Sequence, residues 1–144
     1  MRIEPIGIIH TPFKNKKEAP PLESKSSAVG HLEVHEKYKG GLSDIDGFSH
    51  IIVIFRFHRS RGYRLKLKSR WDNKEIGLFA TRSPRRPNQL GLSILKLLSR
   101  KDNLLKVKGV DMLDGTPLLD IKPYIPDKKL RHGVQTGWLK GKMR

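Results

Sequence analysis

The chain has 144 residues, 36% of them hydrophobic, which is the size and composition of one globular domain with a modest core. Lys and Arg number 30 against 14 Asp and Glu, and the net charge of +16 favours a polyanionic partner. The absence of cysteine excludes disulfides and thiolate metal sites, and no apolar stretch approaches membrane-spanning length, so we expect a cytoplasmic protein without a membrane segment.

The first half of the chain consists of short apolar segments separated by polar loops. Residues 3–9 are expected to form a first strand, and residues 14–27 form a polar, proline-containing loop. Residues 30–34 alternate between polar and apolar, and residues 36–42 are the one helical candidate. Residues 51–55 form a continuous β-branched run, which predicts a strand buried on both faces.

The second half continues the strand pattern. Residues 64–68 alternate cleanly and place Lys66 and Lys68 on an open face. Further strands are expected at residues 76–81, 90–98, 104–110 and 118–121. Short strands with Gly and Pro turns predict a mainly β fold, a single-domain β-barrel over residues 1–130. We expect residues 131–144 to form a basic, flexible tail. No dinucleotide or Walker motif is present, so the fold is not expected to be of the Rossmann type.

The most informative segment is residues 77–93, GLFATRSPRRPNQLGLS. Pro84 and Pro87 stiffen it, so it loses little entropy on ordering and can hold its guanidinium groups in place. Arginine offers a planar fork of donors suited to carboxylate and phosphate. Two interpretations stay open: a preorganised anion-binding loop between two strands, or a tight surface turn with solvated charges.

A second informative segment is residues 109–124, GVDMLDGTPLLDIKPY. Its Asp114-Gly115 pair is a strong turn signal. Asp111 and Asp114 flank two apolar residues, so at least one of these carboxylates is expected to approach a buried surface. The alternative is that Asp114 only caps its own turn.

Together these segments resemble the TsaA-like (YaeB/TrmO) family, whose characterised members are S-adenosylmethionine-dependent tRNA methyltransferases. Residues 79–93 match the family pattern FATRSPxRPNPIGxS except at Gln89 and Leu90, and residues 111–124 match DxxDGTPxxDIKPY throughout. The segment that ends in His58 resembles the family's strand ending in Phe-His. The resemblance spans about residues 3–126.

The resemblance implies a β-barrel that binds S-adenosyl-L-methionine, acts on tRNA and forms a homodimer, with the cofactor near the subunit interface. It places around the cofactor His58, Arg59, Arg82, Leu92, Asp111, Met112, Leu113 and Asp114. Arg82, Asp111 and Asp114 are the catalytic candidates: Arg82 would orient the methionyl carboxylate or a phosphate, and an aspartate would fix polar hydrogens of the cofactor. Without the resemblance, a histidine that ends a buried strand, such as His58, is more often structural.

Four further residues are expected to contact the substrate: Arg86, Asn88, Lys66 and Lys68. Residues 47–71 hold seven basic side chains and no acidic one, which suits nucleic acid. The histidines lack metal-binding spacing, so no metal is expected.

The implied reaction is methylation of N6 of the threonylcarbamoyladenosine next to the tRNA anticodon. One element departs from the family: residues 20–25 lack its Pro-Arg-Gln sequence. This leaves two alternatives open, a methyltransferase with another nucleoside or small-molecule acceptor, and a non-catalytic basic RNA-binding barrel.

Overall fold

A computed structural model describes residues 1–20 and 26–142. Its strands are β1 (Gly7–His10), β2 (Val29–Val34), β3 (His50–Arg56), β4 (Lys66–Lys68), β5 (Glu75–Gly77), β6 (Leu90–Lys101), β7 (Leu104–Lys108) and β8 (Thr116–Pro123). Its short 3₁₀ helices are η1 (Glu36–Leu42), η2 (Ile45–Gly47), η3 (Leu78–Ala80), η4 (Leu130–His132) and η5 (Gly137–Leu139). Two short segments lie outside the described residues, 21–25 and 143–144. The first holds most of the stretch that lacks the Pro-Arg-Gln sequence, and the second belongs to the predicted tail.

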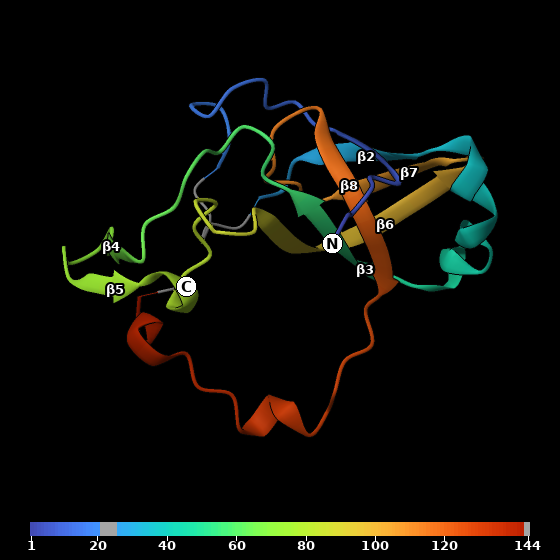
Figure 1. The fold of residues 1–144 in the computed structure, drawn as a ribbon. Helices are drawn as coiled ribbons and strands as arrows, with labels where there is room; N and C mark the ends of the chain where they lie inside the picture. The colour runs from blue at the N-terminus through green and yellow to red at the C-terminus, as the bar shows by residue number, and fades with distance from the viewer. Residues whose placement is uncertain (21–25, 143–144) are drawn as a thin grey trace.

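The strands β1-β2-β7-β6-β3-β8 close into an antiparallel barrel, which confirms the predicted mainly β fold (Figure 1). Alternate side chains of these strands point inward and fill the barrel, because successive residues of a strand face opposite sides. The inward set is almost entirely aliphatic and includes Ile9, Leu32, Ile51, Val53, Leu95, Leu105, Val107 and Leu118, each 0% exposed. A dry interior of this kind is the main stabilising element of the domain.

β3 differs from its prediction. Ile51, Val53 and Phe55 are buried, whereas Ile52 and Ile54 are only half-buried. The expectation of burial on both faces was wrong because a closed barrel has a single interior, and outward-facing β-branched residues have the same appearance in sequence.

Several boundaries also differ. The first strand begins at Gly7, the predicted strand at residues 76–81 is β5 followed by the turn η3, and the helical candidate is the 3₁₀ helix η1. The alternating segment at residues 64–68 contributes β4, which pairs with β5 in a two-stranded hairpin outside the barrel. In the described part of the chain, no helix has the length and apolar character needed to cross a membrane.

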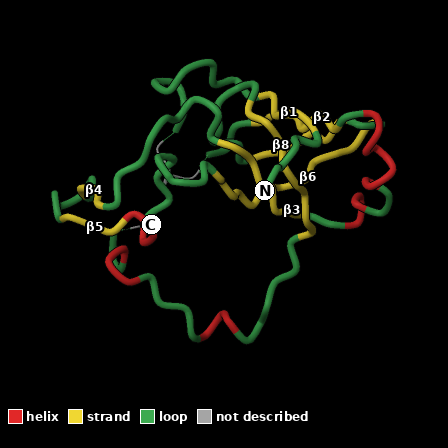
Figure 2. Tube along the Cα trace, viewed as in Figure 1, coloured by secondary structure: helices red, strands yellow, loops and turns green. Residues whose placement is uncertain are grey.

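The C-terminal segment leaves β8, arcs away from the barrel and returns to the β4–β5 hairpin (Figures 1 and 2). There the Trp138 indole Nε1 donates a hydrogen bond to the Ala80 carbonyl at 2.8 Å. The segment therefore has a defined position next to the hairpin, and the flexibility expected for residues 131–144 stays a prediction.

Candidate functional site

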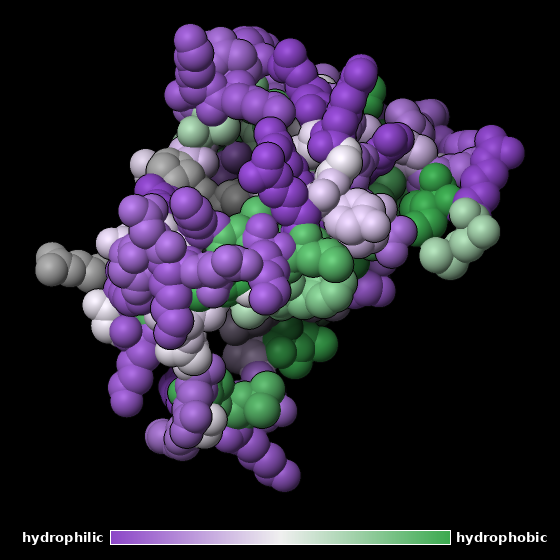
Figure 3. Space-filling view, turned by 60° about the vertical axis from the view of Figure 1, so that its left-hand side comes forward, coloured by the Kyte–Doolittle hydropathy of each residue, from purple (hydrophilic) through white to green (hydrophobic). Residues whose placement is uncertain are grey.

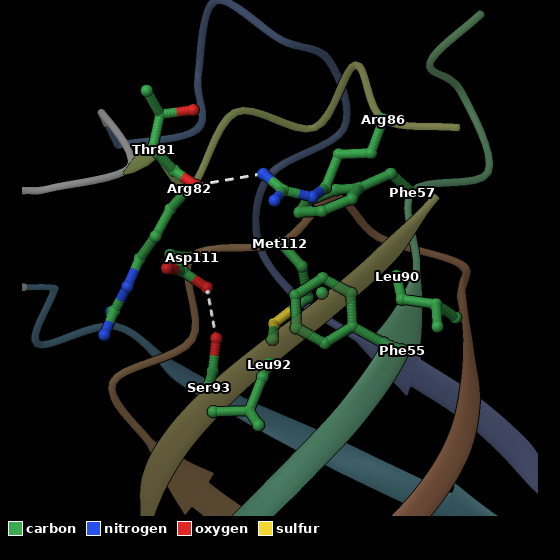
Figure 4. Close-up of a pocket in the computed structure, with 11 residues that line it drawn as sticks. Phe55, Phe57, Thr81, Arg82, Arg86, Leu90, Leu92, Ser93, Asp111 and Met112 are labelled. Carbon is green, nitrogen blue, oxygen red and sulfur yellow. Dashed lines mark hydrogen bonds between the residues drawn. The ribbon is translucent and has the colours of Figure 1, made fainter. Parts of the chain in front are cut away.

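A cavity of about 260 Å³ opens at the end of the barrel where β3 ends and β6 begins (Figure 4). Both matched sequence motifs contribute to it, together with the end of β3. The predicted residues in its lining are Arg82, Arg86, Leu92, Asp111 and Met112, and the others are Phe55, Phe57, Thr81, Leu90, Gly91 and Ser93.

The aromatic wall of the cavity depends on a glycine. Phe55 and Phe57 pack edge to face, with ring centroids 5.2 Å apart and planes at 78°. A Cβ at Gly91 would lie 2.4 Å from a ring carbon of Phe55, so only glycine lets these rings lie against β6. Sequence reasoning missed all three residues, although a glycine inside a predicted strand is a signal of such close approach.

The loop between β7 and β8 positions Asp111. Gly109 and Gly115 bracket it with φ of 104° and 84°, values that favour glycine. Val110 and Met112, on either side of Asp111, are 0% and 4% exposed and anchor the loop in the core. The carboxylate between them is thereby held at the cavity.

The Asp111 carboxylate is a half-buried charge at the cavity. Ser93 Oγ donates a hydrogen bond to its Oδ1 at 3.2 Å (Figure 4). Burial raises the pKa of Asp111, and the Ser93 hydrogen bond and the positive charge of Arg82 oppose this shift in part. The result is a carboxylate more basic than an ordinary aspartate. Ser93 was not predicted, although it ends the first matched motif.

The arginine-rich loop is closed by one of its own side chains. Arg86 Nη1 donates to the carbonyls of Thr81 at 3.0 Å and Ser83 at 3.2 Å, and its guanidinium lies 5.9 Å from the Phe79 ring centre. Arg82 is exposed and extends past Asp111 at the cavity (Figure 4). The loop thus combines a fastened arginine, Arg86, with an exposed one, Arg82, and both line the cavity.

Asp114 lies outside this cavity. Its Oδ1 accepts a hydrogen bond from the Thr11 backbone N–H at 2.9 Å, and its Oδ2 pairs with Lys14 Nζ at 2.7 Å. The Lys14 contact is the main cause that lowers the pKa of Asp114. Asp114 therefore fastens the loop after β1 to the β7–β8 loop, and the turn it was expected to cap is closed by Thr116, whose hydroxyl donates to the Leu113 carbonyl.

The remaining predicted residues also lie outside the cavity lining: His58, Arg59, Leu113, Asn88, Lys66 and Lys68. His58 is half-buried after β3, and burial, followed by the charges of Arg59 and Arg56, lowers its pKa. Arg59 donates to the Lys14 carbonyl at 2.9 Å. Lys66 and Lys68 are exposed on β4, as expected.

A family model for the tRNA-methyltransferase O N-terminal domain matches residues 8–129. The chain belongs to this family. This confirms the resemblance to the TsaA-like (YaeB/TrmO) proteins, and the match covers all of the barrel except Gly7, together with both motifs that line the cavity.

Similar proteins include a "probable S-adenosyl-L-methionine-binding protein" of Pyrococcus abyssi, 48% identical over 94% of this chain and 74% of the relative. The tRNA (adenine(37)-N6)-methyltransferase of Escherichia coli is 35% identical over 87% of this chain and 58% of that enzyme. A crystal structure of TrmO from Pseudomonas aeruginosa superposes with a TM-score of 0.76 at 30% identity, covering 96% of this chain and 62% of that one. The family member described here therefore spans under two thirds of the length of these bacterial methyltransferases.

Replacing Asp111 with asparagine should stabilise the protein at neutral pH. The folded-state pKa of Asp111 is raised, so its ionised form opposes folding at pH values above that pKa. Asp111→Asn keeps an acceptor for Ser93 and removes the buried charge. We expect the melting temperature to rise at pH 7. The gain should shrink as the pH falls through the pKa of Asp111, and a lower melting temperature at pH 7 would contradict this reading.

Two substitutions separate the contacts of Asp114. Asp114→Ala leaves the buried Thr11 N–H without its acceptor and should cost about 1–3 kcal/mol of stability. Asp114→Asn keeps an acceptor and loses the exposed ion pair with Lys14 and the charge that faces His10 at 4.0 Å, so it should cost about 1 kcal/mol or less. Because the pKa of Asp114 is lowered, this stabilisation is present above the ordinary aspartate pKa and is lost as pH falls through the folded value. Equal melting temperatures for both variants would refute the fastening role.

Proposed function

We propose that this protein binds S-adenosyl-L-methionine in the cavity at the end of the barrel and transfers its methyl group to N6 of an adenosine in tRNA. The observation that carries the proposal is the meeting of Arg82 and Leu92 from one matched motif with Asp111 and Met112 from the other in a single cavity. Relatives named as S-adenosylmethionine-binding proteins and as tRNA adenine N6-methyltransferases support it.

The lining of the cavity fits the proposed cofactor. Phe55, Phe57 and Met112 offer apolar and aromatic surface suited to a purine ring. The Arg82 guanidinium suits the methionyl carboxylate, because its fork of donors can bind both oxygens. Asp111 can accept hydrogen bonds from polar hydrogens within the cavity. When bound, the cofactor supplies an electrophilic methyl group carried on a sulfonium.

The protein must supply position and a proton acceptor. An exocyclic adenine amine is a weak nucleophile because its lone pair is delocalised into the ring. A carboxylate that accepts a hydrogen bond from this amine localises the lone pair and receives the proton as the new bond forms. Holding the amine in line at attack distance lowers the barrier further, by several kcal/mol.

We assign the proton acceptor as Asp111. Burial makes its carboxylate more basic, and a base with a pKa closer to neutral is more effective in proton transfer. The Ser93 hydroxyl, hydrogen-bonded to Oδ1, fixes the rotamer and leaves Oδ2 for the amine. Asp114 acts as a positioning residue in this scheme, since it ties the loop of Asp111 to the segment after β1.

The proposed acceptor is the threonylcarbamoyladenosine next to the tRNA anticodon. Its support is the naming of relatives for adenine 37 of tRNA and the net charge of +16, which suits a polyanion. Arg86 and Asn88 beside the cavity, with Lys66 and Lys68 on β4, are proposed to contact the RNA. A tRNA substrate and the absence of cysteine are consistent with the predicted cytoplasmic location.

We further propose that two copies complete the site. The cavity, at about 260 Å³, is slightly smaller than the about 300–1,000 Å³ of typical small-molecule sites. Beside it, the outer face of β6 exposes Leu92 at 52% and Ile94 at 50%, and these pair with the half-buried Ile54 and Ile52 of β3. Such an apolar stripe on a strongly charged protein suits burial against a second copy.

Methyl transfer can be tested directly with tRNA that carries threonylcarbamoyladenosine. We expect S-adenosylmethionine to bind one per subunit by calorimetry, and nucleoside mass spectrometry to find the methylated product. Arg82→Lys should lower kcat/KM by about tenfold or more, because an ammonium cannot reproduce a bidentate fork. Arg85→Lys is the matched control, since Arg85 lies in the same loop outside the cavity lining.

Each alternative function has its own signature in this experiment. Absence of cofactor binding would favour a non-catalytic RNA-binding barrel. Cofactor binding without methylation of this nucleoside would favour another acceptor. Equal activity of Arg82→Lys and the unaltered protein would remove Arg82 from the mechanism.

The dimer can be tested by light scattering. We expect a particle of about twice 16.5 kDa. Ile94→Glu places a charge on the apolar stripe and should give a monomer whose affinity for S-adenosylmethionine falls by about tenfold or more. Val29→Glu, at an exposed apolar residue of β2, should leave both the mass and the affinity unchanged. A monomer that binds the cofactor normally would contradict the shared site.

A further inference from the structure

A second recess lies on the other side of the arginine-rich loop. It has a volume of about 150 Å³ and lies between the β4–β5 hairpin and the returning C-terminal segment. Its walls include two tryptophans, Trp71 and Trp138, and two aliphatic residues, Leu67 and Ile76. An apolar recess of about this volume can hold one planar ring.

The two indole rings lie against each other at an angle and are not stacked in parallel. Their ring centroids are 5.7 Å apart and their planes are inclined by 56°. Trp71 is 39% exposed on the hairpin, whereas Trp138 is half-buried and is held by its hydrogen bond to the Ala80 carbonyl. An ion pair between Lys142 and Asp72 fastens the end of the C-terminal segment to the hairpin. The two indoles are therefore held in a fixed arrangement, and both present their rings to the recess.

Basic side chains lie beside the indole pair. Lys68 lines the recess, and the Arg70 guanidinium lies 5.4 Å from the Trp71 ring centre. One face of the molecule is mostly hydrophilic, with hydrophobic side chains gathered near its middle (Figure 3). Aromatic rings flanked by Lys and Arg are the combination with which proteins bind single-stranded nucleic acid, because bases stack on the rings and phosphates pair with the cations.

The recess adjoins the proposed catalytic cavity. Thr81 lines both, and its neighbours divide between them, since Arg82 faces the cavity and Ser83 the recess. An adenosine that leaves the base stack to enter the cavity uncovers one face of each neighbouring base. A neighbouring base would then meet the two indoles.

We propose that Trp71 and Trp138 form a stacking site for an unpaired base next to the reacting adenosine, with Lys68 placed for an adjoining phosphate. This inference rests on the proposed function and names a contact of the RNA outside the cofactor cavity. It gives the C-terminal segment a role in substrate binding, because Trp138 supplies one of the two indole rings.

Intrinsic fluorescence tests the proposal without mutation, because the chain has two tryptophans and both line the recess. Titration with an unmodified anticodon stem–loop RNA should quench the fluorescence saturably, and a fully paired RNA duplex of equal length should not. RNA binding by filter assay without quenching, or equal quenching by the duplex, would overturn the inference and leave the proposed function standing. No RNA binding at all would overturn both.

Variants separate stacking from a structural role. Trp71→Ala and Trp138→Ala should each weaken stem–loop affinity roughly tenfold while calorimetric affinity for S-adenosylmethionine stays unchanged. Trp138→Phe keeps a stacking face without the indole N–H and should bind RNA nearly normally. Tyr63→Ala, at a 56% exposed aromatic of the same basic segment outside the recess, is the control and should have no effect. If Trp138→Phe is as impaired as Trp138→Ala, the indole only anchors the loop and the proposal fails.

Discussion

The site depends on one hydrogen bond between its two sequence motifs, from the Ser93 hydroxyl to the half-buried Asp111 carboxylate. The antiparallel pairing of β6 with β7 brings the beginning of one strand next to the end of the other, with Lys96 opposite Lys108. Ser93 and Asp111 lie just beyond this paired region. Closure of the barrel thus places a charge in a partly desolvated environment and gives it a hydrogen-bond partner on the neighbouring strand. The aromatic wall and the arginine-rich loop line the same cavity as this carboxylate.

Most of the fold could be predicted from the sequence, because the barrel strands carry strong local signals. The alternation in residues 30–34 and the β-branched run at residues 51–55 both lie in barrel strands. The predictions that failed concern features that only the tertiary structure determines. An outward-facing isoleucine such as Ile52 has the composition of a core residue, and only closure of the barrel decides which face is inside. Similarly, nothing local to residues 64–68 indicates that their strand pairs outside the barrel.

The candidate site was predicted in part. Arg82, Leu92, Asp111 and Met112 come from contiguous motifs, and the structure brings them together in the cavity. Phe55 and Gly91 were missed because their contact is made across the β3–β6 pair, which a sequence pattern does not contain. The Trp71–Trp138 contact spans even more of the chain, and neither tryptophan lies in a recognisable motif. Short motifs therefore identified the charged groups, whereas the aromatic surfaces required the fold.

The central claim is that the ionised carboxylate of Asp111 accepts the proton during methyl transfer. The most direct test is the pH dependence of the single-turnover rate with tRNA, for the unaltered protein and for Ser93→Ala. The account predicts a rate that rises with pH through a pKa above the ordinary aspartate value of about 3.9. Ser93→Ala removes a hydrogen bond that lowers this pKa, so the inflection should move to higher pH. An inflection at the same pH in both proteins, or a rate without pH dependence, would contradict the account.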